Sequence, residues 1–470
     1  LALFYSPLNG EDSGFGKGWN LQLTQVRKHI VTLSSGETYR ITGKSSVTGR
    51  LEMKEQKLRQ FDLYEDPPGP DGAARFRVEH RSGLVEVLQV MGSEEGEVAL
   101  PVELHSPLGH RLHLSYLPFG KGHMRLSEVQ DESDVLLRLQ RSDNSRVELL
   151  CYPSGGDDGG PLARYAMTLR ESDNRVSEII LPTANQARWR FTYEDVLGYL
   201  CVRECTTPYG GVERVFYDDA GHEFPRSAAR DNNLPRVTRH EIDPRFGQAA
   251  KVVRYEYPGT HNFIGGGSSI PWSDEGLDNL YEVPEDYTYK SIQIQEVRTQ
   301  PVRTITRTFN RFHLLTEQAT AQGDKLLQAF TRYADKAGNF ESQEPYFQLP
   351  HDETQRWSLI SNPSRQREEK RVTRYDSHGN VLTRLLPNQV LETNVWYSAE
   401  EEGDEHGFVR NLKTRTVQPA ATGHGAAATL TQAYQYRALT PLGSYLKQPW
   451  RLLESETLSE SGSAPGTFLE

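Results

Sequence analysis

Alternating apolar and polar residues recur along most of the chain and predict β-strands. Residues 76–80 alternate, turn before Gly83, and resume the alternation at 84–88. The same pattern occupies 111–116 and 212–217, each time directly after a glycine-containing turn. Because successive side chains of a strand point to opposite faces, these segments suit half-buried hairpins. We therefore predict an all-β protein.

Helical spacing of apolar residues is scarce by comparison. The best helical candidate is 324–333, a short segment that follows Gly323. The mean hydropathy of −0.65 is low for a compact chain of 470 residues, although aromatic residues make up 10%. A sheet one layer thick would account for both values, since both of its faces would meet solvent or cargo. Disorder is the alternative, but aromatic and β-branched residues run through most of the chain and disfavour it.

A short motif ends several of the predicted strands. Residues 217–221 and 375–379 share the spacing Tyr-Asp-x-x-Gly, and related motifs at 64–69, 193–198 and 333–338 carry one more residue before the glycine. In such a turn the tyrosine closes the strand with a ring that stacks on a neighbour, the aspartate accepts backbone N–H bonds, and glycine supplies a positive φ. The residues expected to build these turns are Tyr193, Gly198, Tyr217, Asp218, Gly221, Tyr333, Gly338, Tyr375, Asp376, Gly379 and Asn380.

Charge and composition exclude several functions. The formal net charge of −11 disfavours nucleic-acid binding, and no stretch of 18 apolar residues is present to span a membrane. The three cysteines, Cys151, Cys201 and Cys205, do not make a disulfide framework and are interpreted as small buried residues. Phosphate-binding, zinc and nucleophile motifs are missing, so we expect no catalytic residue, cofactor or metal ligand.

The motif at 375–380 resembles the YD repeat of Rhs proteins, teneurins and the BC components of insecticidal toxin complexes. A second cluster is similar to the opening segment of bacterial Rhs shells, in which a glycine-punctuated turn precedes a strand. Its residues are Gly14, Phe15, Gly16, Gly18 and Trp19. Together with looser likeness at 106–112 and 261–281, this resemblance covers most of the chain.

The resemblance implies a fold and a role. Repeats of this family form a spiralling β-ribbon that closes into a hollow cocoon around a toxic C-terminal domain of the same polypeptide. Residues 1–470 would then be an N-terminal part of such a shell, and the Leu at position 1 fits an internal piece of a longer chain. The family's self-cleavage motif is Asp-Pro-x-Gly; residues 243–247 have one residue too many and are interpreted as a turn.

We expect residues 259–287 to be a long insertion. The glycine run at 265–267 lacks the Gly-Lys-Ser/Thr ending that would hold phosphate. One hypothesis is that the insertion caps or plugs the lumen of the shell, and the alternative is an ordinary surface loop.

The function expected from these features is a non-enzymatic shell that encloses a C-terminal toxic effector domain of the same polypeptide before delivery. Its partners would be that domain, the rest of the shell, and a delivery machine such as a type VI spike or a toxin-complex pore. The protein would be cytoplasmic first and later delivered out of a bacterial cell. The main alternative is a carbohydrate-binding or adhesive module, because tyrosine-rich β-surfaces stack well on sugars. An unrecognised hydrolase is the third reading.

Overall fold

The structure is a computed structural model. It describes residues 2–142, 145–230, 232–273, 278–421, 427–439, 450–461 and 466–469.

The described residues form β-strands and three short 3-10 helices, with no α-helix, which confirms the prediction of an all-β protein. The first half of the strands are β1 (Leu3–Tyr5), β2 (Trp19–Leu21), β3 (Gln25–Arg27), β4 (Ile30–Thr32), β5 (Thr38–Lys44), β6 (Leu51–Lys54), β7 (Phe61–Asp66), β8 (Arg75–His80), β9 (Val85–Met91), β10 (Val98–His105), β11 (Arg111–Phe119), β12 (His123–Gln130), β13 (Val135–Ser142), β14 (Arg146–Cys151), β15 (Ala163–Leu169) and β16 (Val176–Ile180). The second half are β17 (Arg188–Val196), β18 (Tyr199–Thr206), β19 (Val212–His222), β20 (Leu234–Asp243), β21 (Lys251–Glu256), β22 (Thr288–Val297), β23 (Gln300–Asn310), β24 (Leu315–Gln322), β25 (Lys325–Tyr333), β26 (Pro350–Leu359), β27 (Gln366–Tyr375), β28 (Val381–Leu385), β29 (Leu391–Trp396), β30 (Leu412–Gln418), β31 (Leu430–Ala438), β32 (Arg451–Glu460) and β33 (Gly466–Leu469). The 3-10 helices are η1 (Glu94–Gly96), η2 (Arg226–Ala228) and η3 (Asn279–Glu282).

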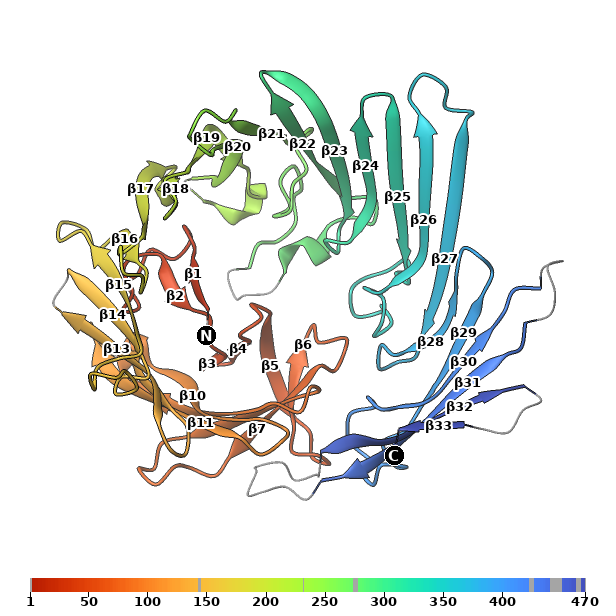
Figure 1. Ribbon diagram of the computed structural model, residues 1–470, viewed down its shortest axis with the longest axis horizontal. Helices are drawn as coiled ribbons and strands as arrows, with labels where there is room; N and C mark the ends of the chain where they lie inside the picture. The colour runs from red at the N-terminus through yellow and green to blue at the C-terminus, as the bar shows by residue number, and fades with distance from the viewer. Residues whose placement is uncertain are drawn as a thin grey trace.

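One long antiparallel sheet contains strands β3 to β33, and β1–β2 form a separate hairpin. From β10 to β33 each strand pairs with the next strand along the chain. The sheet forks at β10, which pairs with β3 as well as with β9 and β11. Figure 1 shows the sheet bending into a ring, which is not closed into a barrel.

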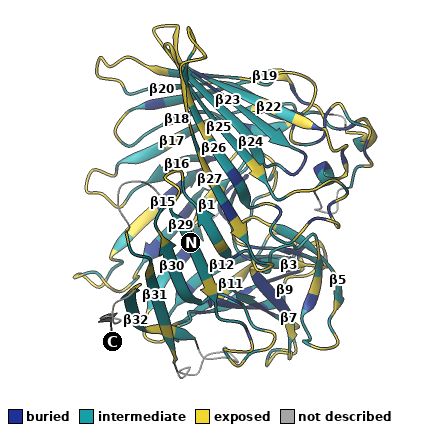
Figure 2. Ribbon diagram, turned by 90° about the vertical axis from the view of Figure 1, so that its right-hand side faces the viewer, coloured by how far each residue is buried: buried dark blue, intermediate teal, exposed yellow. Residues whose placement is uncertain are grey.

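The ring is one layer thick over most of its length. The molecule exposes 25827 Å² of accessible surface, whereas a compact monomer of 53.3 kDa exposes about 18,000 Å². Figure 2 shows intermediate burial along most strands of the ring, with buried positions gathered around β7 and β9. A sheet wetted on both faces therefore explains the low hydropathy of the sequence.

Two apolar cores lie at the N-terminal side of the ring. One lies among β3 to β10 and consists of Val26, Val31, Leu33, Leu51, Phe61, Leu63, Val78, Leu88 and Ala99. The other joins the N-terminal segment to β11–β16 and consists of Phe15, Trp19, Leu114, Leu126, Val129, Leu139, Val147, Met167, Leu169 and Val176. Burial of these side chains supplies the main hydrophobic stabilisation of this half.

The helix predicted for 324–333 is wrong, because the segment is strand β25. Its nine residues pair with β24 on one side and β26 on the other. The apolar spacing at Leu326, Leu327 and Phe330 imitates a helical stripe, but local preference is a weak guide where neighbouring strands supply hydrogen bonds on both sides.

At six places around the ring an aromatic side chain braces a β-bulge. Each aromatic donates a hydrogen bond to the backbone oxygen of a residue at which the register of the two preceding strands shifts. These bonds are Tyr116 to Pro101 (2.7 Å), Tyr217 to Val202 (3.0 Å), Tyr257 to Val237 (3.1 Å), Tyr333 to Leu315 (3.1 Å), Tyr375 to Pro350 (3.0 Å) and Trp396 to Val381 (3.0 Å). The donors lie at or beyond the middle of odd-numbered strands or directly after one, and because these strands all run in the same direction, the braced bulges lie toward one rim of the ring.

The two arms of the ring meet at a seam without strand pairing between them among the described residues. On the N-terminal arm the Arg81 guanidinium donates to the oxygens of His378 (3.1 Å) and Val409 (2.8 Å) and to the Asn380 side chain. Arg59 donates to the oxygens of His406 (2.6 Å) and Gly407 (3.1 Å). Polar side chains reaching backbone carbonyls therefore hold the ring together here.

Candidate functional site

The N-terminal segment identifies the concave face of the sheet. Figure 1 shows β1 and β2 inside the ring. Trp19 packs edge-on against Phe191 with ring centroids 5.4 Å apart, and its indole nitrogen donates to the Tyr193 hydroxyl at 3.2 Å. Phe191 and Tyr193 of β17 therefore point toward the inside of the ring.

Glycines of the N-terminal cluster sit where a side chain would not fit. The Asp12 carboxylate accepts the N–H groups of Gly14 (2.8 Å) and Gly16 (2.9 Å). Although burial acts to raise it, hydrogen bonds from Arg141 and these N–H groups lower the pKa of Asp12. Gly16 has φ +92°, and a Cβ there would lie 2.9 Å from the backbone oxygen of Asn174. Gly18 has φ +82°, and a Cβ there would lie 2.5 Å from the Tyr5 ring.

The turn at 375–380 has the expected aspartate cap. The Asp376 carboxylate accepts the N–H groups of His378 (2.9 Å) and Asn380 (2.8 Å), and Gly379 has φ +79°. Asn380 is buried and donates to the backbone oxygen of Val409 at 3.1 Å, so this turn also contributes to the seam.

The other motif copies keep parts of this arrangement. The Gly221 N–H binds Asp218 at 2.7 Å and the Gly198 N–H binds Asp195 at 2.9 Å. The Gly338 N–H instead binds Glu285 of the insertion at 2.6 Å.

Strand endings at the motif differ from the prediction. Strands end at Tyr333 and Tyr375 but continue past Tyr193 to Val196 and past Tyr217 to His222. All four tyrosines lie opposite bulges, and strand pairing continues beyond the bulge only at Tyr193 and Tyr217. The hydroxyls of Tyr217, Tyr333 and Tyr375 bind backbone oxygens, a role that the expected ring stacking does not describe.

Sequence reasoning missed Tyr116, Tyr257 and Trp396, which brace bulges without a motif aspartate. The signal that they share is an aromatic residue in, or directly after, an odd-numbered strand.

The register of the paired strands shows which residues of the other strands lie on the concave face, because directly paired residues of an antiparallel sheet share a face. Phe191 pairs with Cys205, and Cys205 pairs with Glu213. Val215 lies two residues after Glu213 and therefore on the same face of β19. From Val215 the concave face continues through the pairs Val215–His240, His240–Val253, Val253–Gln295 and Gln295–Arg303. A second route agrees: Tyr289 packs on the insertion and pairs with Phe309, which is an even number of residues from Arg303 on β23. The Arg303 side chain therefore lies on the concave face of the sheet.

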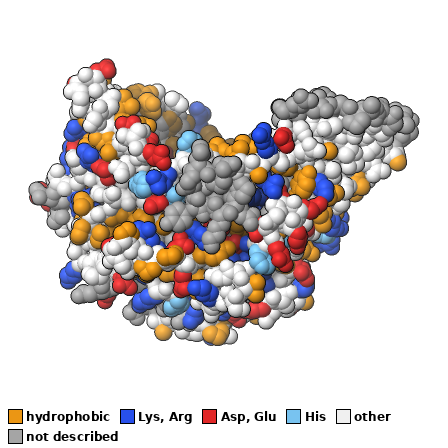
Figure 3. Space-filling view, turned by 90° about the horizontal axis from the view of Figure 1, so that it is seen from below, with side chains coloured by type: hydrophobic (Ala, Val, Ile, Leu, Met, Phe, Trp, Pro, Cys, Tyr) orange, Lys and Arg blue, Asp and Glu red, His pale blue; other side chains and the backbone are white. Residues whose placement is uncertain are grey.

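The concave face of β22–β27 is the more cationic one. By register, its charged residues are Arg303, Arg307, Lys325, Arg367 and Arg371 against Glu353 and Glu369. The convex face of the same strands carries Lys290, Arg332, Arg356, Lys370 and Arg374 against Glu296, Glu317, Asp352 and Glu368. Figure 3 shows both signs interspersed over the surface seen from below.

A groove of about 740 Å³ lies on this cationic stretch, near the hairpin ends of β24–β27. Leu327, Trp357 and Leu359 form its apolar part, and Trp357 remains 37% exposed. Arg303 and Arg365 are among the cations that line it.

The insertion at 259–287 is a packed unit between β21 and β22. In its described residues Ile270, Leu280, Val283 and Tyr287 form a small core. Figure 1 draws the insertion inside the ring. It contacts two other regions, the end of β19 through the ring pairs His222–Phe263 (5.1 Å) and Phe224–Trp272 (5.1 Å), and the segment after β25 through Tyr281–Phe340 (4.5 Å).

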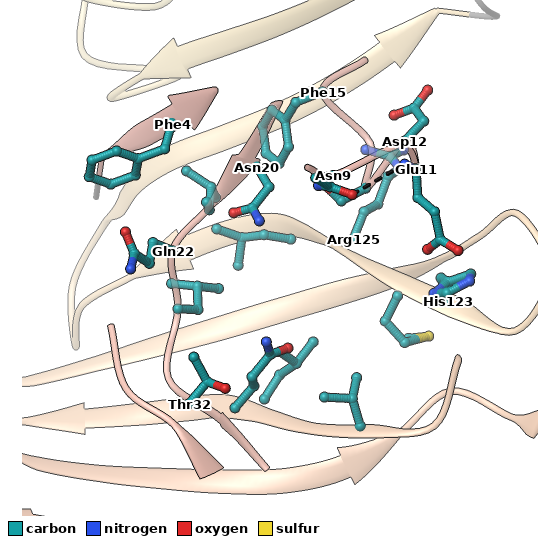
Figure 4. A pocket seen from close by; sticks show the side chains of 18 of the residues that line it. Phe4, Asn9, Glu11, Asp12, Phe15, Asn20, Gln22, Thr32, His123 and Arg125 are labelled. Carbon is teal, nitrogen blue, oxygen red and sulfur yellow. Dashed lines mark hydrogen bonds between the residues drawn. The ribbon is translucent and has the colours of Figure 1, made fainter. Parts of the chain in front are cut away.

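A second pocket, of about 500 Å³, lies between the N-terminal segment and β10–β12. Figure 4 shows Phe4, Asn20 and Gln22 on one side of it and Arg125 and His123 on another. Its lining mixes amides, hydroxyls, apolar side chains and a few charges.

Metal and thiol chemistry finds little support among the described residues. They contain no group of three or more histidine, cysteine or carboxylate side chains able to hold a metal ion. The three cysteines are free thiols, and burial raises the pKa of Cys201 and Cys205 to about 11. No helix in the described ranges is long and apolar enough to cross a membrane.

The fold and its concave face define a single-layer β-shell. No protein-family model and no curated protein matches the sequence. Among solved structures, the chain is similar to TcdB2-TccC3-Cdc42 (10% identity, 93% of this chain and 25% of that chain, TM-score 0.29). It is also similar to the N-terminal domain of effector protein SpvB from Salmonella typhimurium strain LT2 (12% identity, 54% of this chain and 93% of that chain, TM-score 0.25).

The chain spans about a quarter of the length of the TcdB2-TccC3 chains that it matches. At these TM-scores the matches establish no relationship beyond similarity, and the fold of this chain rests on its own structure. Toxin-complex proteins thus recur among the similar structures, whereas membership of the Rhs/YD-repeat family stays a prediction.

Proposed function

We propose that the chain is a section of a proteinaceous shell that encloses a passenger polypeptide, and that it has no catalytic role of its own. The observation that carries this proposal is the single-layer ring: a sheet wetted on both faces, with about 45% more accessible surface than a compact monomer of its mass.

Two inward segments support the same function. The N-terminal segment covers part of the concave face through Phe15 and Trp19, and the insertion at 259–287 lies inside the ring as Figure 1 draws it. In the proposed shell the insertion caps one end of the enclosed space.

The resemblance of the motif at 375–380 to YD repeats supports a toxic effector domain of the same polypeptide as the passenger. Release from a bacterial cell through a type VI spike or a toxin-complex pore belongs to this proposal, as do a cytoplasmic stage before delivery and the rest of the shell as a partner.

Electron microscopy of the complete polypeptide that contains this chain tests the proposal. We expect a closed, hollow particle with density inside it and the insertion at one end. A compact multi-domain particle without an internal space would overturn the shell function.

A further inference from the structure

The groove around Trp357 gives the concave face a specific binding chemistry. We propose that it binds an acidic, extended segment of the enclosed polypeptide; this inference rests on the proposed shell function and names the kind of passenger sequence that the shell holds.

Unpaired cations are the first support for this proposal. Arg303, Lys325 and Arg365 form no ion pair with any carboxylate in the described part of the chain. Two carboxylates of the same strands and turns have other partners: Asp324 accepts the Ser361 N–H (2.7 Å) and hydroxyl (2.6 Å), and Glu369 pairs with Arg367. Like charges gathered on one face of a sheet repel one another, and incoming carboxylates would remove this cost.

The apolar floor of the groove is the second support. Thr320, Leu327, Trp357 and Arg367 are direct neighbours across four strands, and the Arg367 guanidinium lies 5.9 Å from the centre of the Trp357 ring. With strands about 4.8 Å apart, this row spans about 14 Å, the length of about four extended residues. An extended peptide can thus place apolar side chains on Leu327 and Trp357 and carboxylates beside the cations.

Location is the third support. Register places this groove on the concave face, where an enclosed chain would meet it, while the chain as a whole has a formal net charge of −11. A cationic patch inside an acidic protein favours acidic segments by complementarity at short range.

Fluorescence anisotropy tests the inference on the protein purified without a passenger. The probe is a fluorescein-labelled peptide of glutamate, leucine and glycine, compared with a peptide in which lysine replaces glutamate. We expect salt-sensitive binding of the glutamate peptide only. The double variant Lys325→Glu/Arg365→Glu should weaken it by about tenfold or more, and Trp357→Ala should weaken it further at high salt.

Lys290→Glu is the matched control, because Lys290 is an exposed, unpaired cation on the convex face of β22 within the described residues. It should leave the affinity within about twofold, and circular dichroism checks that all variants fold. Equal binding of the lysine peptide, tighter binding of an oligothymidylate, or an unchanged affinity in the double variant would overturn the inference. Because no passenger is present, such a failure leaves the shell proposal standing. A particle without a lumen would overturn the shell and the enclosed origin of the segment, while the measured affinity of the groove for the peptide would stand.

Discussion

At the scale of single residues, aromatic side chains stabilise the sheet at several β-bulges by donating a hydrogen bond to a backbone oxygen. A bulge leaves a backbone oxygen outside the regular ladder, and a buried acceptor without a partner is costly. The Tyr375 hydroxyl satisfies the oxygen of Pro350 at 3.0 Å, and Tyr217 does the same for Val202. The hydroxyl thus matters more to these positions than the ring face that sequence reasoning emphasised.

Replacing Tyr375 by Phe should lower the free energy of unfolding by about 1 kcal/mol, because the oxygen of Pro350 loses its donor while the ring remains. Urea unfolding measures the change. Tyr209→Phe is the control, since Tyr209 is 90% exposed and its hydroxyl braces no bulge. Equal stability of the two variants would contradict the bracing role.

Replacing Gly16 by Ala should detach the N-terminal segment from the concave face. The new Cβ would meet the Asn174 oxygen at 2.9 Å in a backbone conformation with φ +92°, at a cost of about 2 kcal/mol or more. Fluorescence of Trp19 should shift to longer wavelength as it leaves its contact with Phe191. Gly210→Ala, also at positive φ but with nothing near its Cβ, separates backbone strain from the clash.

At the scale of elements, the insertion at 259–287 behaves as a packed unit and not as a free loop. His222 anchors it by lying edge-on to Tyr257 (4.7 Å) and Phe263 (5.1 Å). Burial lowers the pKa of His222 to about 4, Arg236 also lowers it, and Asp218 acts in the opposite direction.

Acid should therefore loosen the insertion. The folded-state pKa of His222 lies below its unfolded value of about 6.5. Its contribution to stability is complete above that value and is lost as the pH falls toward 4, because the unfolded chain takes up the proton first. Hydrogen exchange of residues 259–273 and 278–287 at pH 7 and pH 5 measures this. In His222→Gln the difference between the two pH values should shrink; an undiminished difference would assign the effect to other groups.

Elements were predictable from sequence where alternation is clean, as at 76–80 and 212–217, because period two has one structural meaning. The helical prediction at 324–333 failed because neither face of this strand is buried, so its apolar and polar residues need not alternate. The concave face could not be assigned from sequence, since Arg303 and its convex neighbour Thr304 are both polar-type residues and only register distinguishes them. The groove around Trp357 could not be predicted either, because its residues come from separate strands that only the register places side by side.

At the scale of the whole molecule, the ring depends on a seam held by side chains. Arg81 alone reaches three groups of the opposite arm, and the Arg410 guanidinium reaches back to the Arg81 oxygen at 2.9 Å while lying 4.3 Å from the Trp450 ring centre. Strand pairing elsewhere in the ring is cooperative, but at this seam a few contacts resist separation.

Replacing Arg81 by Ala should open the seam without unfolding the sheet. The oxygens of His378 and Val409 lose a charged donor, at a cost of about 2–3 kcal/mol. Small-angle X-ray scattering should show a larger radius of gyration, while circular dichroism stays unchanged. Arg356→Ala, which breaks a convex ion pair with Glu368, should leave the scattering curve as it is. An unchanged curve for Arg81→Ala would mean that other contacts close the ring.

The spacing of the braced bulges limits how a shell of this kind can evolve in size. Each of these aromatics donates to a bulge formed by the two strands before it, so duplication of a braced strand pair adds a unit that already carries its own brace. Loss of a single strand would reverse the direction of every later strand and move the braces to the opposite rim. Circumference should therefore change among descendants in steps of two strands, about 10 Å at a time.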